Sequence, residues 1–586
     1  MEVTRIFDIL EYNAKTYPDQ ETILAGKVNH EWIKYNIKEY IDRVNKISYA
    51  FLAKGLKTGD KVGIICANRP EWNFFDMAIM QIGCVSIPIY PTISENDYLF
   101  ILNHAEIEYL FVDSAYLVKK IRPILKNVAH FKEIICLNEF EDTIFIEDFY
   151  KLGENNSNPK EVEKRKATIK ETDLATMIYT SGTTGLPKGV MLSHRNIISQ
   201  LKALQDTPSK WSKTCLSFLP LCHAYERILV YLYQYLGMSV WYAENLGTIA
   251  DNIKEIHPTM MSCVPRLLEK IYDKLFLAGK KLTGFKKVLY YWAFNLAKEY
   301  KLDDNSTWYK IRHATADKLI YSKWREAIGG NFDIVVSGSA AIQKHQVAFF
   351  NAINIPIFEG YGLSETSPVI AVSSRGKNNR QAGTVGPPLP GVEIKIVEKD
   401  EIICRGPNVM MGYYKDPELT AEVIDRDGWF HTGDTGRFTE NGLLVITGRI
   451  KNIFKTSMGK YVNPFLIEEQ FSKSPFIENI VIFGEGQKFA AALIQPDFTY
   501  LKDFCRRHNI HFTDNHSIIN TPDIKAIYQK EVKKFNLMFA NYEQIKKYEL
   551  VSDEWSQENG VLTPTLKVKH RVIEEMYKEQ IENLFS

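Results

Sequence analysis

The sequence predicts an α/β protein in which a large N-terminal domain with parallel-rich sheets is followed by a smaller α+β domain. β-type runs alternate with helical patterns along the N-terminal part of the chain, which is typical of βαβ units. The 586 residues, 45% hydrophobic and 24% charged, are enough to bury a sizeable core. From about Lys451 the alternation gives way to short strands and long charged helical patterns. We therefore place the two domains at residues 1–450 and 451–586.

The individual elements follow from apolar runs, which are typical of buried strands, and from helical patterns between them. Ser94 and Asp97 form a capping-box pattern, which predicts the start of a helix. The predicted N-terminal elements are strand 61–67, helix 71–82, strand 84–89, helix 94–103, strand 109–112, helix 115–128 and strand 174–179. Residues 153–173 are polar and rich in charge, so we expect a connection between units of the fold. In the C-terminal domain we expect strands at 480–483 and 490–494 and a helix at 523–540.

Charge and cysteine content exclude several classes of protein. The 72 basic and 71 acidic residues sum to +1, so no global attraction for nucleic acid is expected. None of the eight cysteines forms a C-x-x-C pair and most lie in apolar runs, which predicts reduced, buried thiols. No basic segment followed by an apolar one begins the chain, and the longest apolar stretch, 228–242, is about fifteen residues, too short to span a bilayer. We expect a cytoplasmic protein, with peripheral contact at the inner face of a membrane left open.

The most informative string is residues 179–190, YTSGTTGLPKGV, which follows the predicted strand 174–179. Glycines let backbone N–H groups approach an anion closely, and the hydroxyls and Lys188 add further donors. These features predict a cradle for a polyphosphate. A P-loop would require Gly five positions after Gly182 and Ser or Thr after the lysine, where this chain has Pro187 and Gly189. A turn without chemical meaning is the remaining, less favoured interpretation.

This string resembles the phosphate-binding signature of the adenylate-forming enzymes, a superfamily that includes acyl-CoA synthetases, nonribosomal-peptide adenylation domains and beetle luciferases. Further strings resemble that superfamily's core motifs and occur in the same order. They are LPLCHAYER at 219–227, GYGLSET at 360–366, DGWFHTGD at 427–434, a string beginning GRIK at 448–464, and LTPTLK at 562–567. The resemblance therefore covers residues 179–567 and implies a large adenylate-forming domain followed by a mobile C-terminal domain.

The subgroup is indicated by residues 427–455, which are similar to the signature of fatty acyl-CoA synthetases, and by the forms of 219–227 and 562–567. The resemblance implies a long-chain-fatty-acid–CoA ligase that uses ATP and Mg²⁺ to form an acyl-adenylate. The acyl group then passes to CoA, and AMP and pyrophosphate are released. Transfer to an acyl carrier protein, or a non-catalytic nucleotide- or fatty-acid-binding relative, are the alternatives. No motif encodes acyl-chain length, and a homodimer stays open.

The resemblance also implies roles for individual residues. Glu365, with Thr184, would hold Mg²⁺, which prefers oxygen ligands and substrate phosphates. Ser364 stands where the family usually has Thr and keeps the hydroxyl that would contact the α-phosphate. The implied catalytic residues are Lys567, Glu365, His223 and Lys188. The implied nucleotide-binding residues are Thr180, Ser181, Gly182, Thr183, Thr184, Gly185, Lys188, Gly338, Tyr361, Gly362, Ser364, Asp434, Arg449, Lys451 and Lys567.

Within this set, Tyr361 would lie against the adenine, Asp434 would accept from two ribose hydroxyls, and Arg449 would add a ribose or phosphate donor. Lys451 matches the hinge between the domains. Asp434 in Thr-Gly-Asp could be an ordinary turn residue, since the same tripeptide ends at Asp60 without such a context. The lead-in 429–431, and Arg449 fifteen positions after Asp434, favour ribose binding.

Two further residues have plain structural alternatives. His223 alone would be interpreted as a structural histidine, and only its motif places it near the acyl carboxylate. Lys567 lies in a basic run with Lys569, His570 and Arg571, which alone would predict a solvated face. Together, Lys188, Glu365, Asp434, Arg449 and Lys567 speak against a decayed, binding-only relative.

Residues 279–301 form a basic amphipathic pattern. Phe285, Val288, Leu289, Trp292 and Leu296 recur at helical spacing, with lysines around them. A helix of this kind can lie on a membrane, where fatty acids partition. The alternative is a surface helix that packs this stripe on the core.

Overall fold

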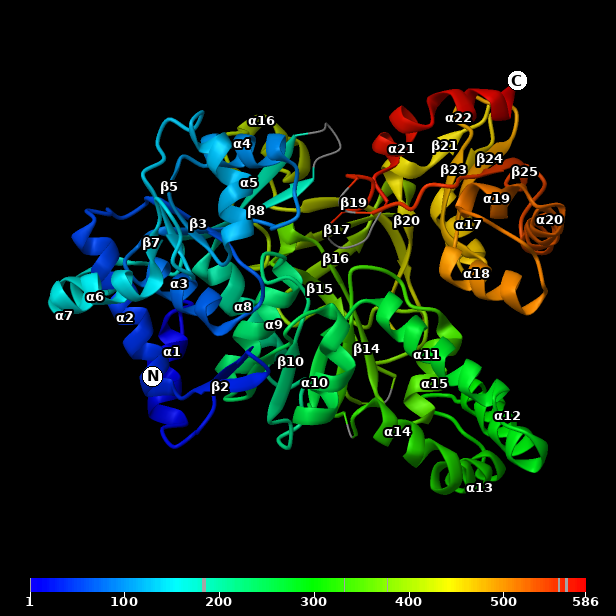
Figure 1. Cartoon of the computed structure of the whole chain (residues 1–586), viewed down its shortest axis with the longest axis horizontal. Helices are drawn as coiled ribbons and strands as arrows, with labels where there is room; N and C mark the ends of the chain where they lie inside the picture. The colour runs from blue at the N-terminus through cyan, green and yellow to red at the C-terminus, as the bar shows by residue number, and fades with distance from the viewer. Residues whose placement is uncertain (1, 182–185, 331, 377, 557–558, 564–567) are drawn as a thin grey trace.

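The computed structural model describes residues 2–181, 186–330, 332–376, 378–556, 559–563 and 568–586. Within these ranges, two large sheets make up most of the N-terminal part of the chain, and a smaller antiparallel sheet follows them (Figure 1). The C-terminal elements from β21 (Phe454–Lys455) onward form a lobe at the upper right of Figure 1. The predicted α/β class, with parallel-rich sheets and a smaller C-terminal unit, is confirmed.

The first sheet contains the predicted βαβ units. Its order is β18-β9-β8-β4-β3-β5-β6-β7, and the strands from β8 to β7 are parallel. These strands are β3 (Lys61–Ile65), β4 (Val85–Pro88), β5 (Ile107–Val112), β6 (Glu133–Cys136), β7 (Ile144–Phe145), β8 (Leu174–Ser181), β9 (Pro187–Ser193) and β18 (Gly412–Tyr413). Helices α4 (Glu95–His104) and α5 (Ala115–Leu125) cover one face. Helices α2 (Ile37–Ala53), α3 (Pro70–Gln81) and α6 (Ile146–Asn155) cover the other. The predicted strands and helices of this region are confirmed, and the Ser94 hydroxyl accepts from the Asp97 N–H at the start of α4.

The second sheet has the order β15-β14-β13-β12-β10-β11-β1-β2 and is parallel except at its two edges. Its strands are β1 (Leu24–Val28), β2 (Glu31–Tyr35), β10 (Thr214–Ser217), β11 (Ser239–Tyr242), β12 (Met260–Cys263), β13 (Ile334–Ser337), β14 (Ile357–Gly362) and β15 (Val369–Val372). Helices α8 (His194–Leu204) and α9 (Ala224–Tyr235) lie on the face toward the first sheet. The opposite face is covered by α10 (Ile249–Ile256), α11 (Pro265–Lys280), α12 (Gly284–Lys298), α14 (Ser322–Ile328) and α15 (Lys344–Ala352).

The third sheet and the C-terminal lobe complete the chain. The four-stranded antiparallel sheet has the order β16-β17-β19-β20, with β16 (Glu393–Ile396), β17 (Glu401–Arg405), β19 (Phe430–Phe438) and β20 (Leu444–Arg449). In the lobe, β23 (Ile477–Phe483), β24 (Ala490–Pro496) and β25 (Ile545–Leu550) form a mixed sheet. The lobe's helices include α17 (Pro464–Phe471), α18 (Phe498–Arg507) and α20 (Pro522–Asn536). The strands predicted at 480–483 and 490–494 and the helix predicted at 523–540 are confirmed.

The segment 153–173, predicted as a connection, contains a helix, so that prediction was wrong in part. Helix α7 (Pro159–Thr168) begins at Asn158, whose side-chain oxygen accepts from the Glu161 N–H, and Pro159 is its first residue. An asparagine cap followed by proline is a helix-start signal. Only Val162 of this helix is buried, so its polar composition reflects solvent exposure rather than a loop.

Two other predictions concern thiols and the apolar stretch. All eight cysteines are free and buried, as predicted. The stretch 228–242 divides into most of α9 and strand β11. Across the described part of the chain, no helix has both the length and the apolar character needed to cross a bilayer.

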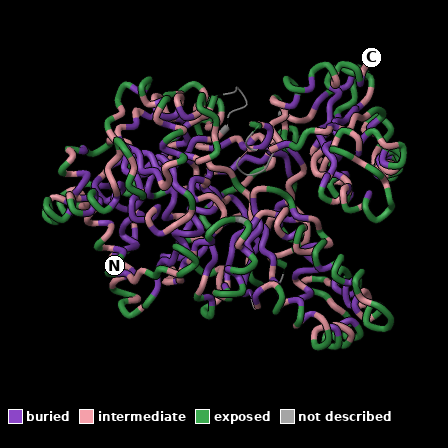
Figure 2. The backbone as a smooth tube through the Cα atoms, in the orientation of Figure 1, coloured by how far each residue is buried: buried purple, intermediate pink, exposed green. Residues whose placement is uncertain are grey.

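The largest buried cluster lies between the two large sheets. Figure 2 shows the buried backbone running through the strands and through the helices between them. Arg227 of α9 lies in this layer and is 1% exposed. It contacts Asp76 of α3 and Thr176 of β8, so helix α9 of the second sheet meets a helix and a strand of the first sheet at one buried charge.

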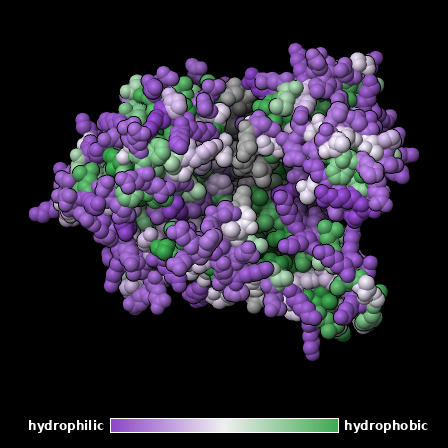
Figure 3. All heavy atoms as spheres, viewed as in Figure 1, coloured by the Kyte–Doolittle hydropathy of each residue, from purple (hydrophilic) through white to green (hydrophobic). Residues whose placement is uncertain are grey.

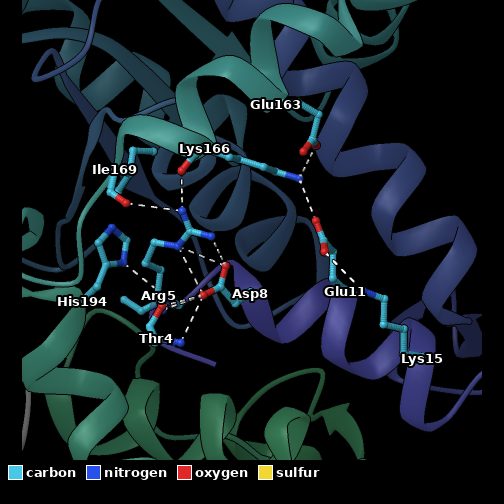
Figure 4. A network of polar contacts seen from close by, with 10 residues as sticks. Thr4, Arg5, Asp8, Glu11, Lys15, Glu163, Lys166, Ile169 and His194 are labelled. Carbon is cyan, nitrogen blue, oxygen red and sulfur yellow. Dashed lines mark hydrogen bonds and ion pairs between the residues drawn. The ribbon is translucent and has the colours of Figure 1, made fainter. Parts of the chain in front are cut away.

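A second polar network ties the N-terminal segment to the body of the domain (Figure 4). The Arg5 guanidinium pairs with Asp8 of α1 (Asp8–Thr16) at 2.7 Å and donates to the carbonyls of Lys166 and Ile169 at the end of α7. His194, the first residue of α8, accepts from the Ile6 N–H through its Nδ1 atom at 3.2 Å. Burial lowers the pKa of His194 to about 3.

This buried histidine predicts a loss of stability in mild acid. Its unfolded pKa is about 6.5, so below that pH the unfolded chain takes up a proton that the folded chain accepts only near pH 3. Stability should therefore fall as the pH drops from about 6.5 toward 3. Between pH 7.5 and 5.0 this one group should remove about 2 kcal/mol of unfolding free energy.

We expect His194→Gln, which keeps a hydrogen-bond acceptor, to flatten this part of the pH dependence in urea unfolding followed by tryptophan fluorescence. His130→Gln, at an exposed histidine, is the matched control and should keep the wild-type slope. An unchanged slope in His194→Gln would mean that His194 is not the responsible group.

Candidate functional site

Four of the predicted residues lie where β14 runs into the short 3₁₀ turn Ser364–Thr366. Tyr361 and Gly362 end the strand, and Ser364 and Glu365 begin the turn. The Leu363 N–H donates to the Pro368 carbonyl at 3.0 Å, which folds the chain back on itself. A Cβ atom on Gly362 would lie 1.6 Å from the Pro368 carbonyl oxygen, so only glycine fits at this position.

Tyr361, Asp434 and Arg449 come together around one carboxylate. Asp434 on β19 and Arg449 on β20 are cross-strand partners, and the Arg449 Nε atom donates to Asp434 Oδ1 at 2.7 Å. The Tyr361 hydroxyl donates to Asp434 Oδ2 at 2.8 Å. Burial, and then the Asp434 carboxylate, raise the pKa of Tyr361 well above its usual range, so the phenol stays a donor. Three predicted residues from separate strands thus form one polar group.

The hairpin of β8 and β9 carries Thr180 and Lys188, which are cross-strand partners. The Lys188 Nζ atom lies 5.4 Å from the centre of the Tyr413 ring. Gly182, Thr183, Thr184 and Gly185, predicted as the phosphate cradle, lie outside the described residues, as does Lys567. Ser181 and Lys451 are described only by their backbones, in β8 and in the 3₁₀ turn Ile450–Asn452. The predictions for all of these residues stay predictions.

Tyr413 is a residue of this region that the sequence analysis missed. Its hydroxyl donates to Glu365 Oε1 at 2.9 Å, while its ring lies beside Lys188. It belongs to a Gly-Tyr-Tyr run at 412–414, outside the strings that carried the resemblance, and Glu365 is 48 positions away in the chain. The only local signal was a tyrosine pair after glycine, which does not indicate a partner.

His223 and Gly338 belong to a third group, around Tyr225. His223 is the N-cap residue of α9, and its Nδ1 atom accepts from the Tyr225 N–H at 3.2 Å. The Tyr225 hydroxyl donates to the Val336 carbonyl at 2.9 Å. A Cβ atom on Gly338 would lie 3.1 Å from the Tyr225 ring, so glycine keeps this approach close. His223 therefore has a capping role, and its chemical role stays a prediction.

Arg449 connects the Asp434 carboxylate and the Glu365 carboxylate electrostatically. Burial lowers the pKa of its guanidinium, whereas the carboxylates of Asp434 and Glu365 raise it, and the net shift is upward. The two carboxylates therefore stabilise the charged form of Arg449. The arrangement can therefore present cationic and hydrogen-bonding groups to a nucleotide.

The donor chemistry at Glu365 suits Mg²⁺. A carboxylate is a hard oxygen ligand, and Mg²⁺ is usually held by one or two carboxylates together with substrate phosphates. Among the described residues, no group of three or more His, Cys, Asp or Glu side chains could hold a metal ion. The role of Glu365 in holding Mg²⁺ together with a phosphate-bearing ligand stays a prediction, and its Oε1 atom accepts from the Tyr413 hydroxyl.

The profile of the AMP-binding enzyme family matches residues 10–414, and that of the AMP-binding enzyme C-terminal domain matches residues 451–586. The chain belongs to the AMP-binding enzyme family. It is 33% identical to fatty acyl-CoA synthetase A of Dictyostelium discoideum over 97% of this chain and 88% of that protein. It is 31% identical to long-chain-fatty-acid–CoA ligase FadD15 of Mycobacterium bovis over 95% of this chain and 93% of that protein.

The fold is also that of solved adenylation domains. The A domain of carboxylic acid reductase from Segniliparus rugosus, solved with AMP and a co-purified carboxylic acid, has a TM-score of 0.74 at 19% identity. The match covers 99% of this chain and 94% of that one. At this identity the likeness establishes the fold.

Proposed function

We propose that the protein is an AMP-forming long-chain-fatty-acid–CoA ligase. It activates a long-chain fatty acid with ATP to an acyl-adenylate and transfers the acyl group to CoA, releasing AMP and pyrophosphate. The observation that carries this proposal is the likeness, over nearly the whole chain, to proteins named as fatty acyl-CoA synthetases or ligases. Those names favour CoA over an acyl carrier protein as the acceptor.

The first half-reaction needs electrostatic help from the protein. A carboxylate and a triphosphate repel each other, so fixed cations and donors must stabilise the charge that develops on the phosphates. Lys188 and Arg449 supply positive charge, and Gly182, Thr183, Thr184 and Gly185, which the sequence predicts as a phosphate cradle, would add backbone and hydroxyl donors. When bound at Glu365, Mg²⁺ would neutralise phosphate charge and polarise the phosphoryl oxygens.

Substrate orientation falls to the Asp434 group. The Asp434 carboxylate accepts from the ribose hydroxyls, the Tyr361 ring lies against the adenine, and Ser364 contacts the α-phosphate. Hydrogen bonds from Tyr361 and Arg449 hold the carboxylate in one orientation before the nucleotide binds. His223, predicted near the acyl carboxylate, and Gly338, predicted to bind the nucleotide, both lie against Tyr225.

We also propose that the chain divides at residues 450 and 451 and that the C-terminal domain moves between the two half-reactions. Two of the hydrophobic clusters consist only of residues from Phe454 onward, which supports a separate core. Among the contacts between the parts is the pair of Arg266 on α11 with Glu478 on β23. Lys567 is needed where the carboxylate meets the α-phosphate, and CoA needs the same space, so rotation about Lys451 would exchange them.

A peripheral membrane contact is proposed at α11, α12, α13 (Thr307–Ala316) and the π-helical turn Asp317–Tyr321. The predicted stripe on α12 is divided: Leu296 is buried, but Phe285 and Val288 are 78% and 67% exposed. The helix packs a neighbouring stripe that includes Tyr290, Ala293 and Phe294. Further exposed apolar side chains of this region are Phe276, Leu277, Trp308, Ile311 and Leu319. Hydrophobic residues gather there at the lower right of Figure 3, next to hydrophilic ones, and the sequence of α12 includes Lys286 and Lys287.

The function is tested by measuring products with fatty acids of graded length, ATP and Mg²⁺. We expect CoA to give acyl-CoA and AMP in equal amounts, with the greatest rate for long chains. An acyl carrier protein in place of CoA should remain unmodified. Acylation of the carrier protein while CoA stays inert would instead establish the alternative acceptor.

The ribose role of Asp434 is tested by comparing ATP with 2′,3′-dideoxy-ATP in equilibrium binding. Hydrogen bonds to a charged group contribute about 1.5–3 kcal/mol each, so the wild type should prefer ATP by about tenfold or more. Asp434→Ala should bind the two nucleotides with affinities that differ by less than about twofold. Asp60→Ala changes the same Thr-Gly-Asp tripeptide elsewhere and should keep the wild-type preference. A preference that survives in Asp434→Ala would assign the ribose contact to another group.

The membrane contact is tested with the double variant Lys286→Glu/Lys287→Glu. Each basic residue near an anionic surface contributes about 1 kcal/mol, so binding to phosphatidylserine vesicles should fall by more than about tenfold. Lys530→Glu/Lys533→Glu makes the same charge change on exposed positions of α20 and should bind as the wild type does. Vesicle sedimentation that does not distinguish the two variants would remove this surface as the contact.

A further inference from the structure

Residues 410–414 join the strand that carries Lys188 to the turn that carries Glu365. In β18, Gly412 and Tyr413 pair antiparallel with Met191 and Val190 of β9. The Tyr414 N–H donates to the Gly189 carbonyl at 2.8 Å, directly after Lys188. On the other side, the Met410 N–H donates to the Glu365 carbonyl at 2.8 Å. The backbone of this segment therefore fixes the distance between two parts of the candidate site.

The side chain of Tyr413 repeats this connection at the functional groups. The residue is 7% exposed, its hydroxyl donates to Glu365 Oε1 at 2.9 Å, and the Lys188 Nζ atom lies 5.4 Å from its ring centre. A phenol has one proton to donate. The hydrogen bond to Glu365 uses that proton.

We propose that Tyr413 is a positioning residue for the phosphate and metal end of the site: its hydroxyl orients the Glu365 carboxylate, and its ring holds the Lys188 ammonium. The assignment rests on the proposed function, in which Glu365 serves Mg²⁺ and Lys188 serves the phosphates. Carboxylates that ligate metals are themselves held by hydrogen bonds from outer groups, which set their orientation. An aromatic ring attracts an ammonium group without neutralising its charge.

The physical reason for a tyrosine at this place is the opposite charge of the two groups. A glutamate and a lysine on flexible side chains attract each other, and a direct ion pair would withdraw both from a ligand. The neutral hydroxyl of Tyr413 donates a hydrogen bond to the Glu365 carboxylate. The neutral ring of the same residue lies beside the Lys188 ammonium. One rigid side chain thus keeps both charges available for a phosphate–Mg²⁺ complex.

The neighbouring Tyr414 supplies a matched comparison. It is also a tyrosine of this segment, but its hydroxyl lies 3.5 Å from Glu106 Oε2, and its ring contacts His104 and Lys61. Removing its hydroxyl changes the same chemical group one position away. If removal of a hydroxyl weakened ATP binding only by disturbing the segment in general, Tyr413→Phe and Tyr414→Phe would show the same loss.

The experiment measures ATP binding to the full chain by calorimetry, without fatty acid or CoA, over a range of Mg²⁺ concentrations and also with EDTA. We expect Tyr413→Phe to raise the Mg²⁺ concentration for half-maximal ATP binding by about 10–100-fold, since the Glu365 carboxylate loses the hydrogen bond that orients it. Binding in EDTA should change by less than about twofold, because the ring beside Lys188 remains. Tyr413→Leu should also weaken binding in EDTA, by about 2–10-fold. Tyr414→Phe should behave as the wild type.

A double-mutant cycle makes the test independent of folding losses. In a Glu365→Gln background, Tyr413→Phe should cause no further change in Mg²⁺ dependence, because its hydroxyl acts through the carboxylate. Additive effects in this cycle, or an unchanged Mg²⁺ dependence in Tyr413→Phe, would overturn the assignment. Equal losses of ATP affinity with Mg²⁺ and with EDTA, together with a lowered thermal midpoint, would also overturn the assignment, because they would indicate a purely structural role for Tyr413. A wild-type chain that binds no ATP would instead overturn the proposed function.

Discussion

The buried charge of Arg227 is the constraint on which the arrangement of the two large sheets depends. A guanidinium taken out of water is tolerated only when it is paired and its donors are satisfied, and breaking such a pair costs about 3–5 kcal/mol. Arg227 meets Asp76 of α3, Thr176 of β8 and Tyr231 of its own helix. These partners come together only when α9, which packs on the second sheet, is seated against the first. The relative position of the sheets is therefore specified by a polar group as well as by apolar burial.

The candidate site depends on that position because each of its parts comes from a different sheet. Lys188 lies on β9 of the first sheet, Glu365 follows β14 of the second, and Asp434 lies on β19 of the third. No single sheet carries enough of these groups to hold a nucleotide. Thr176, which contacts Arg227, lies in β8, the strand that leads toward the residues predicted to bind phosphate. Strand β8 thus carries both a partner of Arg227 and the candidate residue Thr180, and a shift between the sheets would move Lys188 relative to Glu365.

The sequence indicated the local parts of this arrangement well and the long-range contacts poorly. Alternating apolar runs predicted the strands of the first sheet, because the period of side-chain burial is a local property. The strings around Glu365 and Asp434 named the candidate residues, and Arg449, singled out by its spacing from Asp434, contacts Asp434 across two strands. Helix α7 was missed because its polar composition outweighed a clear cap at Asn158. For the stripe on α12, a membrane contact and packing on the core were both open, and the structure buries Leu296 but exposes Phe285 and Val288. An apolar period does not tell what covers it. Tyr413 and Asp76 could not be found, since their partners lie 48 and 151 positions away.

The two cations of the site are treated differently by the fold, and the difference follows from their chemistry. Arg449 has five N–H donors in a rigid fork and uses Nε for Asp434, while its side chain is 49% exposed. It can remain paired with a carboxylate and still present donors to a nucleotide. A lysine ammonium is a compact point charge, and a carboxylate partner would largely cancel its field. Lys188 instead lies beside the neutral ring of Tyr413, while the carboxylate of Glu365 is occupied by the tyrosine hydroxyl. The two solutions differ for this reason: Arg449 stays paired and keeps further donors for a ligand, whereas a neutral tyrosine lies between Lys188 and Glu365.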